Sequence, residues 1–160
     1  MERLTHALTF VAALGSGLMA GLFFVFSVTV MAALARLAPA NGLAAMQSIN
    51  VVILSGTFLS VFMGTALISA VLVVAWFLGW APAGGLYLLA GSIVYLIGII
   101  SVTMVFNVPM NDALAAAQPE SSEAATFWQQ YLSTWTMWNH VRTVASLAAS
   151  ASFIVGITAK

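Results

Sequence analysis

Residues 61–106 read VFMGTALISAVLVVAWFLGWAPAGGLYLLAGSIVYLIGIISVTMVF and contain no charged side chain. They lie within a longer charge-free run from Leu37 to Asn111, whose apolar character is interrupted at Ala81-Pro82-Ala83-Gly84-Gly85. Proline cannot continue a helix and paired glycines relax the backbone, so these five residues indicate a tight turn. Because a membrane-spanning helix needs about 20 apolar residues, the run predicts two spans joined by that turn.

The sequence on either side of this run predicts two more spans. Residues 4–35 and 143–159 are also free of charge, and the chain of 160 residues has only four basic and four acidic side chains. It is 5% charged and 62% hydrophobic, whereas soluble chains are about 25% charged and about 45–50% apolar. A water-soluble domain is therefore excluded. With zero net charge and no basic run, nucleic-acid binding is not expected.

The fold class that follows is an all-α, four-helix transmembrane bundle forming a single domain over residues 1–160. The expected helices cover about residues 5–37, 43–80, 85–117 and 121–157, with Pro39 and Gly42 in the first turn and Ser121 or Ser122 capping the last helix. All four exceed the about 20 residues that cross a bilayer, so the helices are expected to project on one side or to tilt. The apolar stretch near the N-terminus is too long for a signal peptide and is interpreted as a retained first helix.

Polar side chains gather at one end of this bundle, whereas the turn from Trp80 to Gly85 at the other end is uncharged. The gathered residues are Arg36, Asn41, Met46, Gln47, Asn50, Asn107, Asn111, Asp112, Glu120, Glu123, Gln129, Gln130, Asn139, His140 and Arg142. The distribution of basic residues, with Arg3 and Lys160 on the face opposite Arg36, predicts cytoplasmic termini in a plasma or inner membrane. The polar end then faces outward.

Small residues recur at helical spacing and predict close helix contacts. Gly17 and Gly21 form a GxxxG pattern, and Gly91 and Gly98 are seven residues apart, as are Thr57 and Gly64. Helices in lipid associate through such positions, since no hydrophobic drive brings them together there. The GxxxG pair serves contacts either within the chain or between chains of a homo-oligomer.

The last helix has the strongest functional pattern. Trp128, Tyr131, Trp135, Asn139 and Arg142 follow at spacings of three and four, so one stripe brings aromatic, amide and guanidinium groups toward the interior. A charge at membrane level is costly, and arginine keeps its proton, so this side chain needs a partner or an anionic ligand. Two interpretations stay open. Either Asp112 pairs with Arg142 and closes the bundle mouth, or the stripe forms a ligand pocket with Trp135 as a stacking wall.

His140 lies about 100° around the helix from Asn139, which favours a neighbouring helix over the central cavity. Its side chain is a candidate general base or metal or haem ligand, and the alternative is a hydrogen-bonded structural histidine. His6 lies toward the other end, so a site of several histidines is excluded. Trp138, off the stripe, is assigned to the membrane interface.

Three amides, from Asn50, Asn107 and Asn139, come from three different helices. They either pair with one another or bind hydroxyl or keto groups of a ligand. Pro109 is expected to kink the third helix and to free carbonyl groups near Val105 and Phe106. A set of methionines toward the same end, namely Met31, Met46, Met104, Met110 and Met137, admits Cu(I), although methionine also fills space. No cofactor or a haem is favoured over copper.

Five motifs resemble the anthrone oxygenase-like membrane family. They are Gly17-Leu-Met-Ala-Gly-Leu-Phe-Phe-Val-Phe-Ser27, Met46-Gln-Ser-Ile-Asn50, Phe106-Asn-Val-Pro-Met-Asn-Asp112, Trp128-Gln-Gln-Tyr131 and Trp135-Thr-Met-Trp-Asn-His-Val-Arg142. The resemblance implies a four-helix membrane fold, and its fungal members are associated with oxidising anthrones to anthraquinones. It carries over to Asn50, Asn107, Asn111, Asp112, Trp135, Asn139, His140 and Arg142. Fold transfers more safely than reaction between relatives.

The function expected from these residues is that of a membrane oxygenase acting with dioxygen on a hydrophobic, anthrone-like aromatic substrate. His140 or Asp112 would be the base, Arg142 with Asn139 or Asn107 would hold the enolate oxygen, and Trp135 with Tyr131 would stack on the rings. Substrate contacts are also expected from Asn111, Trp128, Gln47 and Met46. The alternatives are a haem- or copper-binding redox protein with His140 as the haem ligand, or a non-enzymatic membrane subunit that binds a small ligand. A transporter is disfavoured because polarity stops partway along the bundle.

Overall fold

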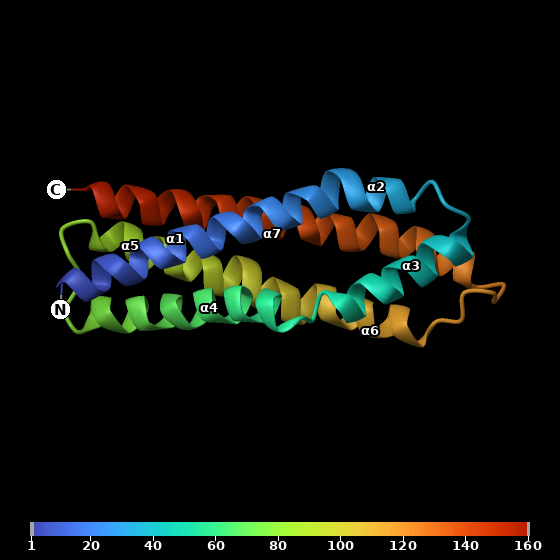
Figure 1. The fold of residues 1–160 in the computed structure, drawn as a ribbon, viewed down its shortest axis with the longest axis horizontal. Helices are drawn as coiled ribbons and strands as arrows, with labels where there is room; N and C mark the ends of the chain where they lie inside the picture. Colours follow the sequence, from blue (N-terminus) through green and yellow to red (C-terminus); the bar gives the residue numbers. More distant parts are fainter. Residues whose placement is uncertain (1, 160) are drawn as a thin grey trace.

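A computed structural model describes residues 2–159, and this part of the chain is helical with no strand (Figure 1). The first rod contains α1 (Glu2–Val25), a π-helical segment (Phe26–Val30) and α2 (Met31–Leu34), and the second contains α3 (Pro39–Val52) and α4 (Gly56–Phe77). The third contains α5 (Gly85–Tyr95), π-helical segments at Leu96–Ser101 and Thr103–Asn107, and α6 (Val108–Ala116). The fourth is the unbroken helix α7 (Ala124–Thr158). The all-α, four-helix class predicted from the sequence is confirmed.

Four stretches are long and apolar enough to cross a bilayer, namely Arg3–Leu34, Gly56–Phe77, Gly85–Ala116 and Ala124–Thr158. The protein is therefore an integral membrane protein. The N-terminal end, the C-terminal end and the α4–α5 loop lie at one end of the bundle, and the α2–α3 and α6–α7 loops lie at the other (Figure 1). Lys160, on which the orientation argument partly rests, lies outside the described residues.

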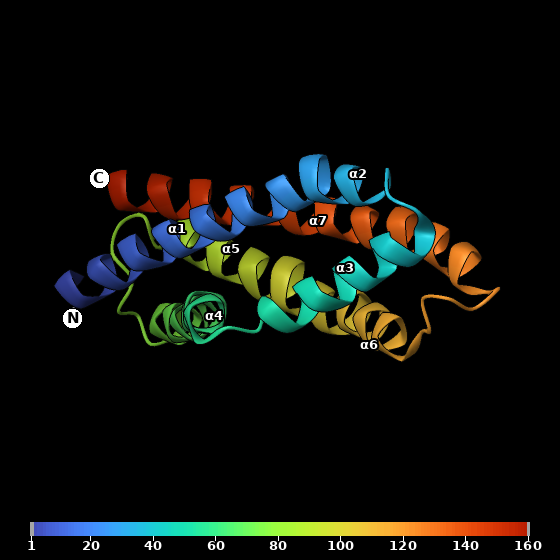
Figure 2. The same ribbon diagram turned by 45° about the vertical axis from the view of Figure 1, so that its right-hand side comes forward.

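The second helix does not run unbroken from residue 43 to residue 80 as expected. It is interrupted at Ile53-Leu54-Ser55, and Ser55 caps the new helix by accepting a hydrogen bond on its Oγ from the backbone N–H of Phe58 at 3.4 Å. Figure 2 shows α4 nearly end-on while α3 is seen from the side, so the chain changes direction at this break. Serine favours this position because its hydroxyl satisfies a backbone donor that the helix leaves free.

The start of the last helix also differs from the prediction. Neither Ser121 nor Ser122 caps the last helix, which begins at Ala124 without a side-chain cap. The Ser122 hydroxyl instead donates to the Glu123 carboxylate at 2.8 Å, and this bond lowers the pKa of that exposed carboxyl. The third helix continues through Pro109, and a π-helical turn lies just before the proline, with the N–H of Val108 donating to the carbonyl oxygen of Thr103 five residues earlier.

Two apolar clusters fill the bundle, and a polar region of α7 lies between them. Trp128 and Trp135 belong to the cluster near the α6–α7 loop, whereas Ala149 and Phe153 belong to the cluster near the termini. The stretch of α7 between these clusters contains Asn139 and Arg142, both buried. The polar stripe predicted from the sequence is therefore interior.

The half of the bundle near the termini is less apolar than expected. The hydroxyls of Ser16, Ser69, Ser92 and Ser146, one from each rod, are buried there without a hydrogen-bond partner in the described chain. Serine side chains are small enough to fit where two helices touch. Scattered among apolar residues, they do not make the sequence of this half look polar.

The glycines divide into packed and exposed positions. A Cβ on Gly98 would lie 2.6 Å from that of Ala145, and one on Gly91 would lie 3.0 Å from the Phe153 ring, so the third rod and α7 approach closely as predicted. Gly21 is exposed and a Cβ there would meet nothing within 4 Å. The GxxxG pattern therefore does not form a tight contact within the chain at Gly21.

Candidate functional site

Arg142 lies in the middle of α7 with 6% of its surface exposed. One terminal nitrogen donates to Oδ1 of Asn139 at 2.6 Å and the other donates to Oγ1 of Thr103 at 3.3 Å. No ion pair with a carboxylate is present for this guanidinium within residues 2–159, and its Nε has no hydrogen-bond partner there. The predicted Arg142–Asp112 pair is therefore not formed, and Asp112 is exposed instead.

Aromatic rings enclose the guanidinium. Its carbon lies 4.4 Å from the centre of the Phe23 ring and 5.2 Å from that of the Trp135 ring. Aromatic faces attract cations, by about 2 kcal/mol or more where water is excluded. The rings thus stabilise the charge partly, while its neutral hydrogen-bond partners leave it without a compensating anion.

Asn139 fixes this arrangement by joining α7 to the first rod. Its Nδ2 donates to the carbonyl oxygen of Phe23 and to Oγ of Ser27, both at 2.7 Å. Since the amide nitrogen is used by these two acceptors, its oxygen must face Arg142. Ser27 lies in the π-helical segment of the first rod, and such segments occur frequently at functional sites.

A second network lies one turn away on α7. Oδ1 of Asn111 accepts hydrogen bonds from the Tyr131 hydroxyl at 2.8 Å and from Nε1 of Trp135 at 2.9 Å. Nδ2 of Asn50 donates to the same hydroxyl at 3.5 Å. The tyrosine and tryptophan rings are stacked, with centroids 6.0 Å apart. The two rings predicted to form a stacking wall thus lie against each other, and their polar atoms are held by amides from α3 and α6.

Asn107 completes the polar layer. Its Nδ2 donates to the backbone oxygen of Trp135 at 3.4 Å, and its Oδ1 is buried without a partner in the described chain. Buried polar atoms are usually hydrogen-bonded, so an orphaned amide oxygen needs an explanation such as a ligand or a water. The three predicted amides do not pair with one another, because each bonds to a backbone or hydroxyl group.

A cavity of about 100 Å³ lies between these networks. The side chains that line it and carry polar atoms are Asn50, Thr103, Asn111, Trp135, Asn139 and Arg142. The remaining, apolar lining comes from the first three rods and includes Phe23, Met46 and Phe58. The site is thus a small apolar chamber with amides and one cation on its wall.

The predicted site residues divide into those at the cavity and those away from it. Asn50, Asn111, Trp135, Asn139, Arg142 and Met46 line it. Tyr131 and Asn107 support it through the bonds described above, and Trp128 stacks on Tyr131 inside the adjoining apolar cluster. Gln47 donates to the carbonyl oxygens of Leu114 and Ala117, which ties α3 to α6.

His140 and Asp112 are not brought to the cavity, because both side chains are exposed. A haem held by His140 would lie on the outer surface of the bundle, away from Arg142. Trp138, assigned to the membrane interface, stacks on Phe106 with ring centroids 3.5 Å apart. No group of three or more histidine or acidic side chains that could hold a metal ion occurs among residues 2–159.

Sequence reasoning missed Phe23, Ser27 and Thr103 as site residues. Phe23 and Ser27 lie within the Gly17–Ser27 motif, and a hydroxyl in an apolar run was the available signal for Ser27 and Thr103. That signal is weak because many serines and threonines in membrane helices bond to their own backbone, as Thr65 does here.

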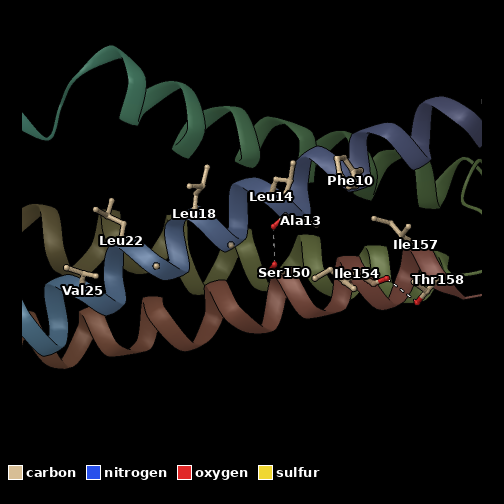
Figure 3. Close-up of a pocket in the computed structure, with 12 residues that line it drawn as sticks. Phe10, Ala13, Leu14, Leu18, Leu22, Val25, Ser150, Ile154, Ile157 and Thr158 are labelled. Atoms are coloured by element: carbon tan, nitrogen blue, oxygen red, sulfur yellow. Dashed lines mark hydrogen bonds between the residues drawn. The ribbon is translucent and has the colours of Figure 1, made fainter.

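A larger hollow of about 890 Å³ lies elsewhere, between α1 and α7, and Figure 3 shows the residues that line it. Its polar side chains are Ser150 and Thr158, and both hydroxyls already donate to backbone oxygens. The rest of its lining is apolar or glycine, so it offers a groove for lipid chains without groups for chemistry.

The fold and the cavity define an integral membrane four-helix protein with a buried cation in an aromatic and amide-lined chamber. The sequence model of the anthrone oxygenase family matches residues 57–152, more than half of the chain, and the protein belongs to this family. The matched range includes Asn111, Trp135, Asn139 and Arg142 but not Asn50. No curated protein and no solved structure matches the chain.

Proposed function

We propose that the protein is a membrane oxygenase that binds the ionised form of an anthrone-like aromatic compound beside Arg142 and lets dioxygen oxidise its activated methylene. The observation that carries the proposal is the buried guanidinium, which has no carboxylate partner in the part of the chain that the structure describes. A buried charge needs compensation, and an enolate or phenolate oxygen supplies it. Family membership supports the oxygenase class.

The chemistry needs an anion and dioxygen. Loss of a proton from the methylene gives an electron-rich enolate, whose carbon forms a bond to dioxygen. The resulting hydroperoxide loses water to leave a ketone, so that R2CH2 and O2 become R2CO and H2O. A charge-assisted hydrogen bond contributes about 1.5–3 kcal/mol, which lowers the pKa of the bound carbon acid by roughly 1–2 units.

Arg142 therefore carries the role that is best supported, and Asn111, whose amide also lines the cavity, orients the ligand. The proposal does not place the base on His140 or Asp112, since both are exposed. Hydrogen bonds to the enolate replace a side-chain base, because the substrate gives up its proton to water before its ionised form binds beside Arg142. Trp135 supplies an aromatic face for the substrate rings.

The test uses the protein reconstituted in vesicles with an anthrone as substrate. Arg142→Met is expected to lower the rate of quinone formation and oxygen uptake at least about 100-fold, the size of effect seen when an oxyanion donor is removed. Arg36→Met, which removes an exposed arginine, is the matched control and is expected to retain the rate. His140→Ala is also expected to retain it.

A full rate in Arg142→Met would contradict the proposal. A rate abolished in His140→Ala, together with a haem absorption band lost in the same variant, would favour a haem protein instead. No quinone formation in any variant, with tight binding of a hydroxyanthraquinone to the wild type, would favour the non-enzymatic ligand binder.

A further inference from the structure

The cavity beside Arg142 is closed toward the α6–α7 loop. Four large side chains fill that end, from Leu43, Met46, Leu114 and Trp128, and each is at most 1% exposed. Gln47 reinforces the closure by bonding to the last carbonyls of α6. An aqueous opening at the polar end would require this apolar plug to come apart.

The cavity is closed toward the termini as well. Phe23, Phe62 and Ile99 are buried beneath it and belong to the apolar cluster that fills the rest of the bundle. Interiors packed in this way leave few voids larger than a water molecule, so a flat aromatic compound cannot pass along the bundle axis.

The side wall at the break between α3 and α4 is thin. Leu54 lines the cavity and is nevertheless 62% exposed, so the cavity reaches the outer surface of the bundle at this side chain. An outer hollow of about 380 Å³ adjoins this wall and shares Ile49, Ile53 and Phe58 with the cavity. The cavity and the outer hollow are therefore neighbours at the break, separated there by the three side chains that they share.

The position of this wall matches the bilayer. The 22 residues of α4 extend about 33 Å at 1.5 Å per residue, which is close to the about 30 Å thickness of the hydrocarbon core. The break at Ser55, directly before α4, then lies where hydrocarbon meets the headgroups. Flat aromatic molecules that also carry polar groups concentrate at this depth, as tryptophan and tyrosine side chains do.

We infer that the aromatic ligand reaches Arg142 sideways from the bilayer, through a portal formed by Ile53, Leu54 and Phe58. The inference rests on the proposed function for the identity of the ligand, although not for the route. The chamber of about 100 Å³ is smaller than the about 300–1,000 Å³ of ordinary ligand pockets, so the wall must move when a ligand enters. The break is the hinge, because Leu54 bonds only weakly to Val51, at 3.3 Å, and the helical ladder stops there.

The test uses Met46→Cys as a reporter, since the chain contains no cysteine. Met46 lines the cavity and is 0% exposed, so a reagent can reach this position only through the chamber or the plug. The smaller side chain also loosens the plug, which biases the experiment against the inference. Labelling in vesicles is compared between a bilayer-dissolved aromatic maleimide and a charged, water-soluble methanethiosulfonate.

The maleimide is expected to label Met46→Cys at least about tenfold faster than the charged reagent. Adding Leu54→Trp should slow the maleimide about tenfold, and adding Leu54→Ala should speed it. Leu67→Trp is the matched control, because Leu67 is also on the outer surface, 67% exposed, and lines neither hollow at the break. It should leave the rate unchanged.

Three outcomes would overturn the portal. They are faster labelling by the charged reagent, equal slowing by Leu54→Trp and Leu67→Trp, and no labelling by either reagent. None of these measurements involves catalysis. A portal that behaves as expected in a protein that forms no quinone would therefore refute the proposed function and leave the route standing.

Discussion

Arg142 donates a hydrogen bond of 2.6 Å to Asn139, three residues earlier on the same helix, and the geometry of the cavity depends on this contact. Asn139 can accept from Arg142 because its nitrogen is already bonded to Phe23 and Ser27 of the first rod. The amide therefore positions the guanidinium and also joins two helices.

Asn139→Ala is expected to destabilise the fold by about 2–4 kcal/mol, since it removes three buried hydrogen bonds, one of them to the Arg142 guanidinium. Thermal unfolding in detergent measures the loss. Asn41→Ala, at an exposed asparagine near the start of α3, is the control and is expected to be nearly neutral. An equally small effect of both substitutions would show that Asn139 is not a structural link.

Oδ1 of Asn111 accepts hydrogen bonds from two donors, the Tyr131 hydroxyl and the Trp135 N–H. Asn111→Leu should cost about 2–3 kcal/mol by orphaning the Tyr131 hydroxyl and the Trp135 N–H. Adding Tyr131→Phe should then recover about 1 kcal/mol, since it removes one orphaned donor. Unfolding of the two single variants and the double variant measures this coupling. Additive losses would contradict the network.

The fold and the α7 side of the site could be predicted because both depend on local features of the sequence. The charge-free runs fix the spans, and the spacing of Trp135, Asn139 and Arg142 fixes one helix face, so both are local properties of the sequence. The amide pairings are not local. Asn139 bonds to Phe23, 116 positions away, and such a contact follows only once the rods are placed side by side.

The break at Ile53-Leu54-Ser55 could not be predicted because its residues resemble an ordinary apolar helix. No proline marks it, and serine in a membrane helix usually bonds to its own backbone. His140 is the opposite case. Its position about 100° around the helix from Asn139 predicted a side chain outside the cavity, whereas the chemistry of histidine favoured a place in the site; the side chain is exposed.

Two serines on α7, one turn apart, provide a matched pair. The Ser146 hydroxyl is buried with no hydrogen-bond partner among residues 2–159, whereas that of Ser150 donates to the carbonyl of Ala13 at 3.0 Å. Ser146→Ala is expected to be neutral or stabilising by up to about 1 kcal/mol, and Ser150→Ala to cost about 0.5–1.5 kcal/mol. Thermal unfolding separates the two. A larger loss at Ser146 would reveal a bond to an internal water.

The glycines make another matched pair. A Cβ on Gly84 would collide with the backbone of Gly156, where the start of α5 meets the end of α7, whereas one on Gly21 would meet nothing within 4 Å. Gly84→Ala should therefore destabilise by about 1–3 kcal/mol, the usual cost of overpacking. Gly21→Ala should be neutral or slightly stabilising, because alanine favours a helix. Equal effects on unfolding would argue against the tight α5–α7 crossing.

The orientation of the bundle in the membrane determines from which leaflet a ligand enters the portal. Basic residues concentrate on the cytoplasmic side, and Arg3 near the N-terminal end suggests cytoplasmic termini, so the polar end and the break would face outward. Asn41→Cys is then expected to react with an impermeant thiol reagent in intact cells, and Ala83→Cys, in the loop at the terminal end, only after permeabilisation. The reverse pattern would place the portal in the inner leaflet. Because the labelling assay for the portal can be run with reagent added to one leaflet, the two experiments together fix the side from which a ligand reaches Arg142.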